Sequence, residues 1–582
     1  MPPIPLQSPA QVIERNDKAG EVGLFSAFTS YVSSVMNDEP PEPNDQEIEA
    51  TLTTVDCITA CRFEEILGNV SELPVESLKS LTMSLLAHLP ENESPRVITV
   101  KPEMPAPTPV RANGAKSPSV EQPVYDPAVV YVLELATILA LRDEETIVAL
   151  GSDVSKALQS VIGDAEHLHP VALSRTVFYL LGLLRASNDH GYIRAPVVLH
   201  AISSFRDDLL RQCALPILKG IHGCVSGPPE LKKEMATSPD FWSVLHTLQP
   251  VPEAAPLVLQ IAETVAHYET SAITADNYEA MVSLLNGFAM AGSVGARIEQ
   301  HREQPVRRGQ KPPPEPEKKP KKPEAVVRAT KALSLVSQLA SRVPSLIEHS
   351  HLETNEAWRA YWSPVFRCLA TQCCNPCREV RHQAFNSLQR CLLSSELASQ
   401  DHKEWTNIFG EVLFPLIQQL LKPEVHQTDT AGMGETRVQA AQLLCKIFLH
   451  YLVLLSEWEA LQEMWVKILD IMERLIASGQ SDVLSEAVPE SLKNILLVMG
   501  NGGYLVPPTA SEGQTDQQSE LWKETWTRLE RFLPGLMTEL FPGAEKASRD
   551  TIEPQSNGTA KPPAGDQIPE RPASAVAEPQ AA

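Results

Sequence analysis

A group of thiols and one imidazole contains the residue types that could support chemistry. A structural zinc site needs four such ligands, usually supplied as two pairs. Cys374 and Cys377 form one Cys-x-x-Cys pair, and no second pair follows at a suitable spacing. Cys368 and Cys391 fall on apolar helical faces, where a free cysteine behaves as a small hydrophobic residue. The sequence therefore predicts no metal site, and an enzyme that uses these cysteines is kept as a third alternative. The full group is Cys368, Cys373, Cys374, Cys377, His382 and Cys391.

The sequence lacks the common catalytic motifs. It contains no Gly-rich phosphate loop, no Gly-x-Ser-x-Gly turn and no His-Glu-x-x-His pair. Its acidic residues are spread over helix surfaces and form no carboxylate pair. We therefore predict that the chain is not an enzyme and uses no cofactor.

Composition indicates a large acidic protein without a nucleic-acid partner. The chain has 582 residues, which is too many for one core, and its formal net charge is −24. Binding to nucleic acid requires clustered lysine and arginine, so this charge argues against it. The ten cysteines are scattered through apolar helical stretches, as is typical of a reducing cytosol.

No targeting or membrane-spanning segment is expected. The N-terminus has neither the basic nor the apolar region of a signal peptide. No window reaches about 18 uninterrupted apolar residues. The longest apolar stretch, 129–141, is interrupted by Glu134 and is interpreted as a buried helix.

Residues 375–393 contain the clearest structural pattern. Asn375 and Pro376 suit the start of a helix, where Asn can cap free N–H groups and Pro loses no hydrogen bond. An apolar stripe then recurs every four residues, which predicts an amphipathic helix like the second helix of a HEAT repeat. Such a helix needs neighbouring helix pairs to cover its stripe. The stripe consists of Val380, Ala384, Leu388 and Leu392.

Two later stretches, 434–448 and 481–498, repeat this pattern irregularly. Arg381 and Arg437 are 56 positions apart in the sequence, whereas a regular repeat has roughly 40–47 residues. The loop 422–434 accommodates the surplus. No strand-like alternation appears, so we predict an all-α, irregular HEAT/armadillo-like helical solenoid in two blocks, with disordered linkers and tail.

Proline-rich and polar tracts divide the chain into segments. The predicted segments are a flexible N-terminus (1–20), a helical segment (21–90), a Pro-rich linker (91–126), a helical block (127–298), a basic Pro-rich linker (299–325), a HEAT-like helical block (326–541) and a disordered tail (542–582).

The second linker is locally basic and has two interpretations. It is a solvated polyproline spacer, or it contacts anionic lipid, with each charge contributing about 1 kcal/mol near such a surface. Interspersed glutamates favour the spacer. The candidate lipid contacts are Lys318, Lys319, Lys321 and Lys322. A last helix over 519–541 has mixed charges, so we predict that it closes the helical array and does not lie on a membrane.

Three segments resemble a known family. They are Gly434–Arg437, 481–499 and the Leu-Trp-Lys-Glu-Thr-Trp sequence at 521–526. All three are similar to the C-terminal part of the large Golgi Arf guanine-nucleotide exchange factors of the brefeldin-A-resistance class. The resemblance is strong over 358–541 and weaker over 21–290. The catalytic SEC-seven-type domain of that family contains a Phe-Arg-Leu-Pro-Gly-Glu-Ala motif, which this sequence lacks.

The resemblance implies a region downstream of the exchange domain. Expected features are a regulatory and scaffolding role in Golgi vesicle transport, a cytoplasmic location peripheral on Golgi membranes, and partners among Arf/Rab-type small GTPases and Golgi lipids. Exposed ends of a helical array also allow self-association. A generic α-solenoid adaptor unrelated to Arf is the alternative. Candidate surface residues, for which helix capping or intramolecular pairing is the competing interpretation, are Glu435, Arg437, Glu486, Glu490, Lys493 and Asn494.

Overall fold

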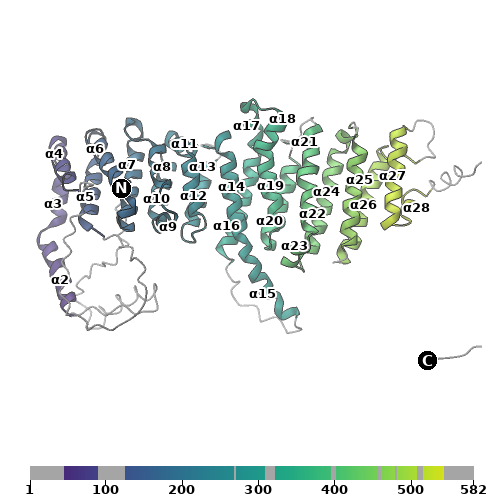
Figure 1. The fold of residues 1–582 in the computed structure, drawn as a ribbon, viewed down its shortest axis with the longest axis horizontal. Helices are drawn as coiled ribbons and strands as arrows, with labels where there is room; N and C mark the ends of the chain where they lie inside the picture. The colour runs from purple at the N-terminus through teal and green to yellow at the C-terminus, as the bar shows by residue number, and fades with distance from the viewer. Residues whose placement is uncertain are drawn as a thin grey trace, which may run out of the picture. The chain divides into compact units, whose positions relative to one another are not determined.

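The computed structural model describes residues 45–89, 125–267, 271–307, 322–394, 397, 402–456, 458, 460–478, 482–507 and 515–542. These residues form helices and contain no strand, so the predicted all-α solenoid class is confirmed (Figure 1). The chain divides into two compact units, Met1–Leu443 and Leu444–Ala582. The boundary between them lies inside helix α24 (Met433–Leu455).

The first unit contains most of the helices. Its elements are α2 (Asp45–Ala60), α3 (Phe63–Ser71), α4 (Val75–Leu86), α5 (Pro127–Ala140), α6 (Glu144–Gly163), η1 (Ala165–His167), α7 (Pro170–Ala186), η2 (Asn188–His190), α8 (Ala195–Ser203), α9 (Asp207–Gln212), α10 (Ala214–Val225), α11 (Pro229–Thr237), α12 (Pro239–Leu248), α13 (Ala255–Ala266), α14 (Ala275–Ala291), η4 (Gly292–Val294), α15 (Gly295–Arg307), α16 (Glu324–Ala340), α17 (Val343–Ser350), α18 (Thr354–Ala357), η5 (Trp358–Trp362), α19 (Ser363–Gln372), α20 (Arg378–Leu392), α21 (His402–Asn407), η7 (Ile408–Leu413), α22 (Phe414–Leu420) and α23 (Pro423–Thr428).

Successive helix pairs of the first unit stack side by side. Helix α7 packs against α10, α10 against α13, α13 against α16 and α16 against α20 (Figure 1). Each of these helices has apolar residues on the faces that its neighbours cover. In α7, for example, Val177, Leu180, Leu181 and Leu184 are fully buried. The core is therefore a continuous layer between helix pairs, as expected for a helical repeat array.

Helix α20 confirms the predicted apolar stripe. Val380, Ala384, Leu388 and Leu392 are all 0% exposed. The helix begins at Arg378, two residues beyond Pro376, so the predicted start was too early. Asn375 caps a turn before the helix, because its Oδ1 accepts the Cys377 N–H at 3.0 Å. A carboxylate from another helix accepts the first helical N–H, with Arg378 N lying 3.1 Å from Glu299 Oε2.

The basic linker is shorter than predicted. Helix α15 continues α14 without a break and extends to Arg307, inside the predicted linker 299–325. Helices α14 and α16, on either side of this linker, pack directly against each other. The boundary between the two compact units falls at 443/444, so positions 299–325 belong to the first unit.

Two short π-helices occur at matching places in neighbouring repeats. Helix η5 precedes Pro364, and η7 precedes Pro415. Proline has no N–H, and its ring clashes with the carbonyl four residues earlier, here that of Ala360 or Glu411. Widening the turn to π geometry relieves this clash. The two segments also touch, because Trp358 Nε1 donates to Glu411 Oε2 at 3.0 Å.

The second unit contains the end of α24 with α25 (Leu461–Ala477), α26 (Asp482–Asn501), α27 (Asp516–Phe532) and α28 (Leu536–Leu540). Trp465 of α25 is fully buried, stacks on Phe448 and donates from Nε1 to Thr525 Oγ1 at 2.9 Å. The predicted single helix over 519–541 is wrong. The chain breaks between α27 and α28, because Gly535 adopts φ 83° directly after Pro534.

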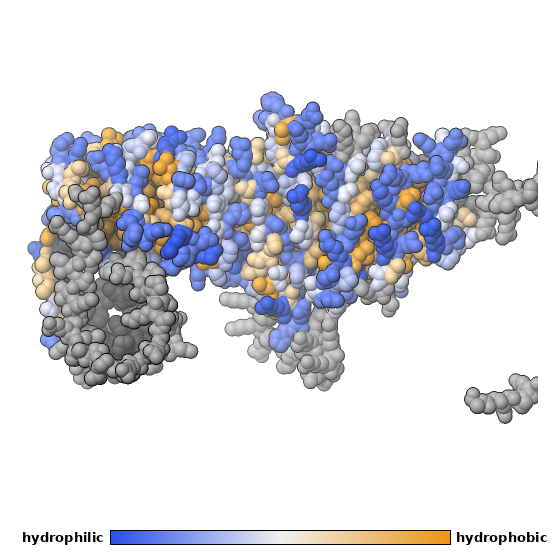
Figure 2. Space-filling model, viewed as in Figure 1, coloured by the Kyte–Doolittle hydropathy of each residue, from blue (hydrophilic) through white to orange (hydrophobic). Residues whose placement is uncertain are grey.

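Two helical stretches are long and apolar enough to cross a membrane by length and composition alone. They are Ala275–His301 and Met433–Leu455, with 50% and 61% of their apolar windows buried inside the structure. Burial of this extent is also typical of core helices. On the face seen in Figure 2, hydrophilic residues alternate with smaller apolar areas.

Glycine at 292 permits a close approach of three helices. A Cβ atom there would lie 2.5 Å from Ala329 Cβ in α16 and 2.9 Å from Val380 Cγ2 in α20. Gly410, in η7, has open space around the same position. We expect Gly292→Ala to lower the free energy of unfolding by about 1–3 kcal/mol through overpacking. The matched variant Gly410→Ala should be neutral or stabilising, and denaturant unfolding followed by circular dichroism compares the two. Equal midpoints would contradict the close packing at Gly292.

Candidate interaction surface

Three of the predicted surface residues share one exposed side of α26. Glu486, Glu490 and Asn494 are spaced four apart and are all exposed. The opposite side of the helix is buried, with Val488, Leu492 and Ile495 at 0% exposure. The three candidate residues are therefore accessible at the surface. Their role in binding a partner stays a prediction.

Lys493 is occupied within the chain. Its Nζ lies 2.7 Å from Glu539 Oε1 in α28, and its side chain is 29% exposed. The hydrogen bond to Glu539 raises the pKa of Lys493. Gly500 also lies close to Phe541, just after α28, where a Cβ would be 2.8 Å from Phe541 Cζ. Lys493 therefore helps to hold α28 against α26, which is the intramolecular pairing that competed with a surface role.

Arg437 does not lie at the surface, and its prediction as a surface residue is wrong. Its side chain is 0% exposed, and its Nε donates to the carbonyl oxygen of Leu420 at 2.9 Å. Burial lowers its pKa. Glu435, two residues earlier in the first turn of α24, is exposed as predicted. The charged pattern of the sequence did not distinguish these residues, because a buried arginine looks the same in sequence as an exposed one.

A buried ionic cluster around Asp429 was not predicted. Arg378 approaches Asp429 through two bonds of 2.7 Å, and Arg381 donates to Asp429 Oδ2 at 2.5 Å. The Gly432 N–H donates to Asp429 Oδ1 at 3.0 Å, and Arg381 Nε donates to Thr436 Oγ1 at 3.1 Å. Burial alone would raise the pKa of Asp429, but the bonds from both arginines hold it well below its usual value.

This cluster fixes the loop that the sequence assigned as surplus length. Residues 422–434 contain α23 and then Asp429, which links α20 to the start of α24. Arg378 and Arg381 both lie off the apolar stripe of α20, and Arg381 is only 2% exposed. Their spacing of three residues on one helix was the available signal, because both can then reach the same acceptor.

Among the candidate lipid contacts, Lys322 is described by the structure and the other three lie outside the described residues. Lys322 is exposed, and its Nζ lies 2.6 Å from Glu379 Oε1. An exposed ion pair of this kind contributes little and is easily exchanged for another anion.

In the candidate cysteine and histidine group, four cysteines are buried, Cys374 is half-buried and His382 is exposed. Cys368, Cys373, Cys377 and Cys391 are each at most 4% exposed. Burial raises the pKa of Cys368 to about 12 and that of Cys374 to about 11. A thiolate is the form that attacks or binds metal, so these thiols are poorly suited to either role. No group of three or more potential metal ligands occurs among the described residues.

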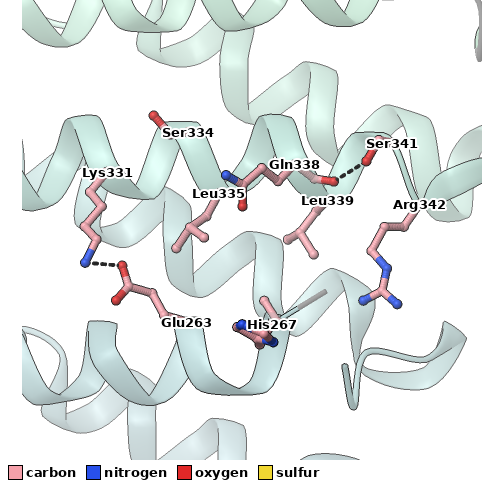
Figure 3. A pocket seen from close by; sticks show the side chains of 10 residues that line it. Glu263, His267, Lys331, Ser334, Leu335, Gln338, Leu339, Ser341 and Arg342 are labelled. Atoms are coloured by element: carbon pink, nitrogen blue, oxygen red, sulfur yellow. Dashed lines mark hydrogen bonds and ion pairs between the residues drawn. The ribbon is translucent and has the colours of Figure 1, made fainter. Parts of the chain in front are cut away.

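A cavity of about 590 Å³ lies between α13 and α16 (Figure 3). An ion pair between Lys331 and Glu263 spans it. Ser334 points away from His267 in Figure 3, and Ser341 donates to the Gln338 carbonyl oxygen. The lining residues therefore offer no serine–histidine pair for nucleophilic chemistry. The cavity is a gap between repeats, in which Lys331 and Glu263 pair with each other and Arg342 donates to the Ser271 hydroxyl.

The ionic cluster predicts a specific effect on stability. Asp429→Asn leaves two arginines without their shared carboxylate, so we expect a loss of about 3–5 kcal/mol in the free energy of unfolding. Because the pKa of Asp429 in the folded chain lies below the usual aspartate value of about 3.9, its stabilisation is present above that pH and is lost as the pH falls below it. Denaturant unfolding at pH 7 and pH 3 should show a smaller difference between wild type and Asp429→Asn at pH 3. An equal difference at both pH values would contradict the assigned pairing.

Residues 362–536 match the family described as "GBF1-like, tetratrico peptide repeat region". The Golgi-specific brefeldin A-resistance guanine nucleotide exchange factor 1 homolog of Caenorhabditis elegans is 33% identical over 231 residues, covering 38% of this chain and 11% of that protein. The ARF guanine-nucleotide exchange factor GNOM of Arabidopsis thaliana is 24% identical over 560 residues, covering 93% and 34%. ARF guanine-nucleotide exchange factor 2 of Saccharomyces cerevisiae is 20% identical over 533 residues, covering 88% and 31%.

The chain thus spans about a third of the length of GNOM and of the yeast protein. Among solved structures, a circular tandem repeat protein matches at 14% identity over 73% of this chain and 86% of that chain, with a TM-score of 0.20 that carries no weight for the fold. The resemblance found in the sequence is confirmed. Residues 362–536 are similar to the GBF1-like repeat region, and most of the chain is similar to ARF exchange factors.

Proposed function

We propose that this chain supplies regulatory and scaffolding surface to an Arf guanine-nucleotide exchange factor in Golgi vesicle transport, without exchange chemistry of its own. The similarity to GNOM over 93% of the chain supports this proposal. The similar residues lie in stacked helix pairs, and arrays of this kind present an extended binding surface. The chain acts in the cytoplasm, peripherally on Golgi membranes, with small GTPases of the Arf/Rab type and membrane lipids as partners.

The exposed side of α26 is the proposed contact for a protein partner. It presents Glu486 and Glu490 one turn apart, followed by Asn494 and the exposed Leu497. Carboxylates in this arrangement suit a partner helix that carries Lys or Arg at the same spacing. The same surface on a second copy is also acidic, so self-association uses other faces.

Nucleotide exchange tests the absence of chemistry. Arf loaded with a fluorescent GDP analogue should release it at the intrinsic rate when this chain is added, because the Phe-Arg-Leu-Pro-Gly-Glu-Ala motif is missing from the sequence. An isolated SEC-seven-type exchange domain serves as the positive control. Faster release with this chain alone would overturn the proposed division of roles.

Flotation with vesicles of Golgi-like lipid composition tests the basic linker. Replacing Lys318, Lys319, Lys321 and Lys322 by Gln should weaken binding to anionic vesicles by about 10²–10³-fold, since each charge contributes about 1 kcal/mol. The control variant carries Gln at four exposed lysines elsewhere, namely Lys79, Lys156, Lys219 and Lys233. If both variants float as wild type does, the linker has no part in recruitment.

A further inference from the structure

Among the described residues, an exposed apolar stripe runs along α14, the 3-10 turn η4 and α15. Met290, Val294 and Ile298 are 56%, 49% and 42% exposed. The three residues follow one another along this helical stretch, and Gly292, Gly295 and Ala296 between them are buried. Exposed apolar residues are ordinary when scattered singly, but neighbouring ones mark a contact surface.

The stripe faces away from the folded core. The opposite side of the same stretch contains Gly292, Gly295 and Ala296, all buried. A Cβ on Gly295 would lie 2.7 Å from Cys377 Sγ and 2.7 Å from Val326 Cγ2, so this side is pressed against α16 and the start of α20. The helix is therefore apolar on two opposite sides, and the repeat array covers one of them.

The charges beside the stripe are positive. Between positions 290 and 301 the exposed charged or titratable residues are Arg297 and His301. Glu299, the single carboxylate in this interval, is turned toward α20, where it accepts the Arg378 N–H. In the sequence, positions 302–322 then contain eight basic and three acidic residues. This local excess of positive charge contrasts with the net charge of −24 for the whole chain.

We propose that the stripe of Met290, Val294 and Ile298 is a membrane-insertion surface that enters the headgroup–acyl boundary of an anionic bilayer. The proposal rests on the membrane recruitment proposed above and identifies the part of the fold that carries it. A helix with apolar residues on one side and cations beside them binds anionic membrane surfaces in this way. Helix α15 extends beyond the end of α20 (Figure 1).

A second copy of the chain fits this surface less well. Two copies docked symmetrically through the stripe would place Arg297 of one beside Arg297 of the other, with no exposed carboxylate in the interval 290–301 to offset them. An anionic bilayer supplies both the apolar interior and the negative charge that the stripe requires. An acidic protein of this net charge can approach such a bilayer only through a locally basic region.

Sedimentation with anionic vesicles of phosphatidylserine and phosphatidylcholine tests the stripe directly. The double variant Val294→Glu and Ile298→Glu should lose binding at least about tenfold, because a carboxylate at the bilayer boundary is unfavourable. The matched control, Val148→Glu and Val197→Glu, changes two exposed valines on α6 and α8 and should bind as wild type does. Circular dichroism verifies that both variants fold.

An environment-sensitive fluorophore reports insertion independently. It is attached at Ile298→Cys or, as a control, at Val148→Cys, in a chain whose exposed thiols are removed by Cys57→Ser and Cys61→Ser. Anionic vesicles should shift the emission at 298 to the blue and leave the emission at 148 unchanged. Vesicles of phosphatidylcholine alone should shift neither.

The outcomes separate the stripe from recruitment in general. Vesicle binding without a blue shift at 298 would overturn the stripe and leave recruitment through another surface. No binding by the unsubstituted chain would overturn both. If the glutamate variant changes the mass measured by light scattering but not vesicle binding, the stripe is a contact between copies and the proposal is wrong.

Discussion

Every amphipathic helix needs a neighbour that covers its apolar side, and this requirement determines the structure. A stripe such as that of α20 is stable only when α16 and α19 cover it, and those helices need neighbours in turn. Hydrogen bonds and ion pairs between helices are secondary, and they stabilise the chain where the repeat is irregular. The Asp429 cluster ties the loop between α23 and α24 to α20. Apolar burial sets the spacing of the helices, and these bonds set the path of the chain between them.

The same constraint explains what the sequence could predict. The apolar stripe of α20 follows from residue types at a spacing of four, and the structure confirms it. The position of the α20 start could not be predicted, because Glu299, distant in sequence, caps it. Arg437 and Arg381 were placed as polar residues, but their burial depends on Leu420 and Asp429, which lie 17 and 48 positions away. The local spacing of apolar residues predicts which side of a helix is buried. It does not predict polar partners that are distant in the sequence.

In such an array, binding surfaces arise on helix sides that no neighbouring helix covers. The side of α26 that contains Val488, Leu492 and Ile495 is buried, and its acidic side is exposed. Helix α15 leaves an apolar side exposed next to cations. These two surfaces differ in chemistry, so the proposed contacts with a protein partner and with lipid lie on different helices. The similarity to ARF exchange factors places both within regions shared with longer relatives.

The two π-helices restrict the sequence changes that this protein can undergo during evolution. Each π turn contains one residue more than an α turn, and each lies before a proline, Pro364 or Pro415. Deleting a single residue from one of them would rotate every preceding side chain of that helix by about 100°. The Trp358–Glu411 bond would then be lost unless the neighbouring repeat shifted as well. The two widened turns are therefore tied together, and related sequences should gain or lose them jointly.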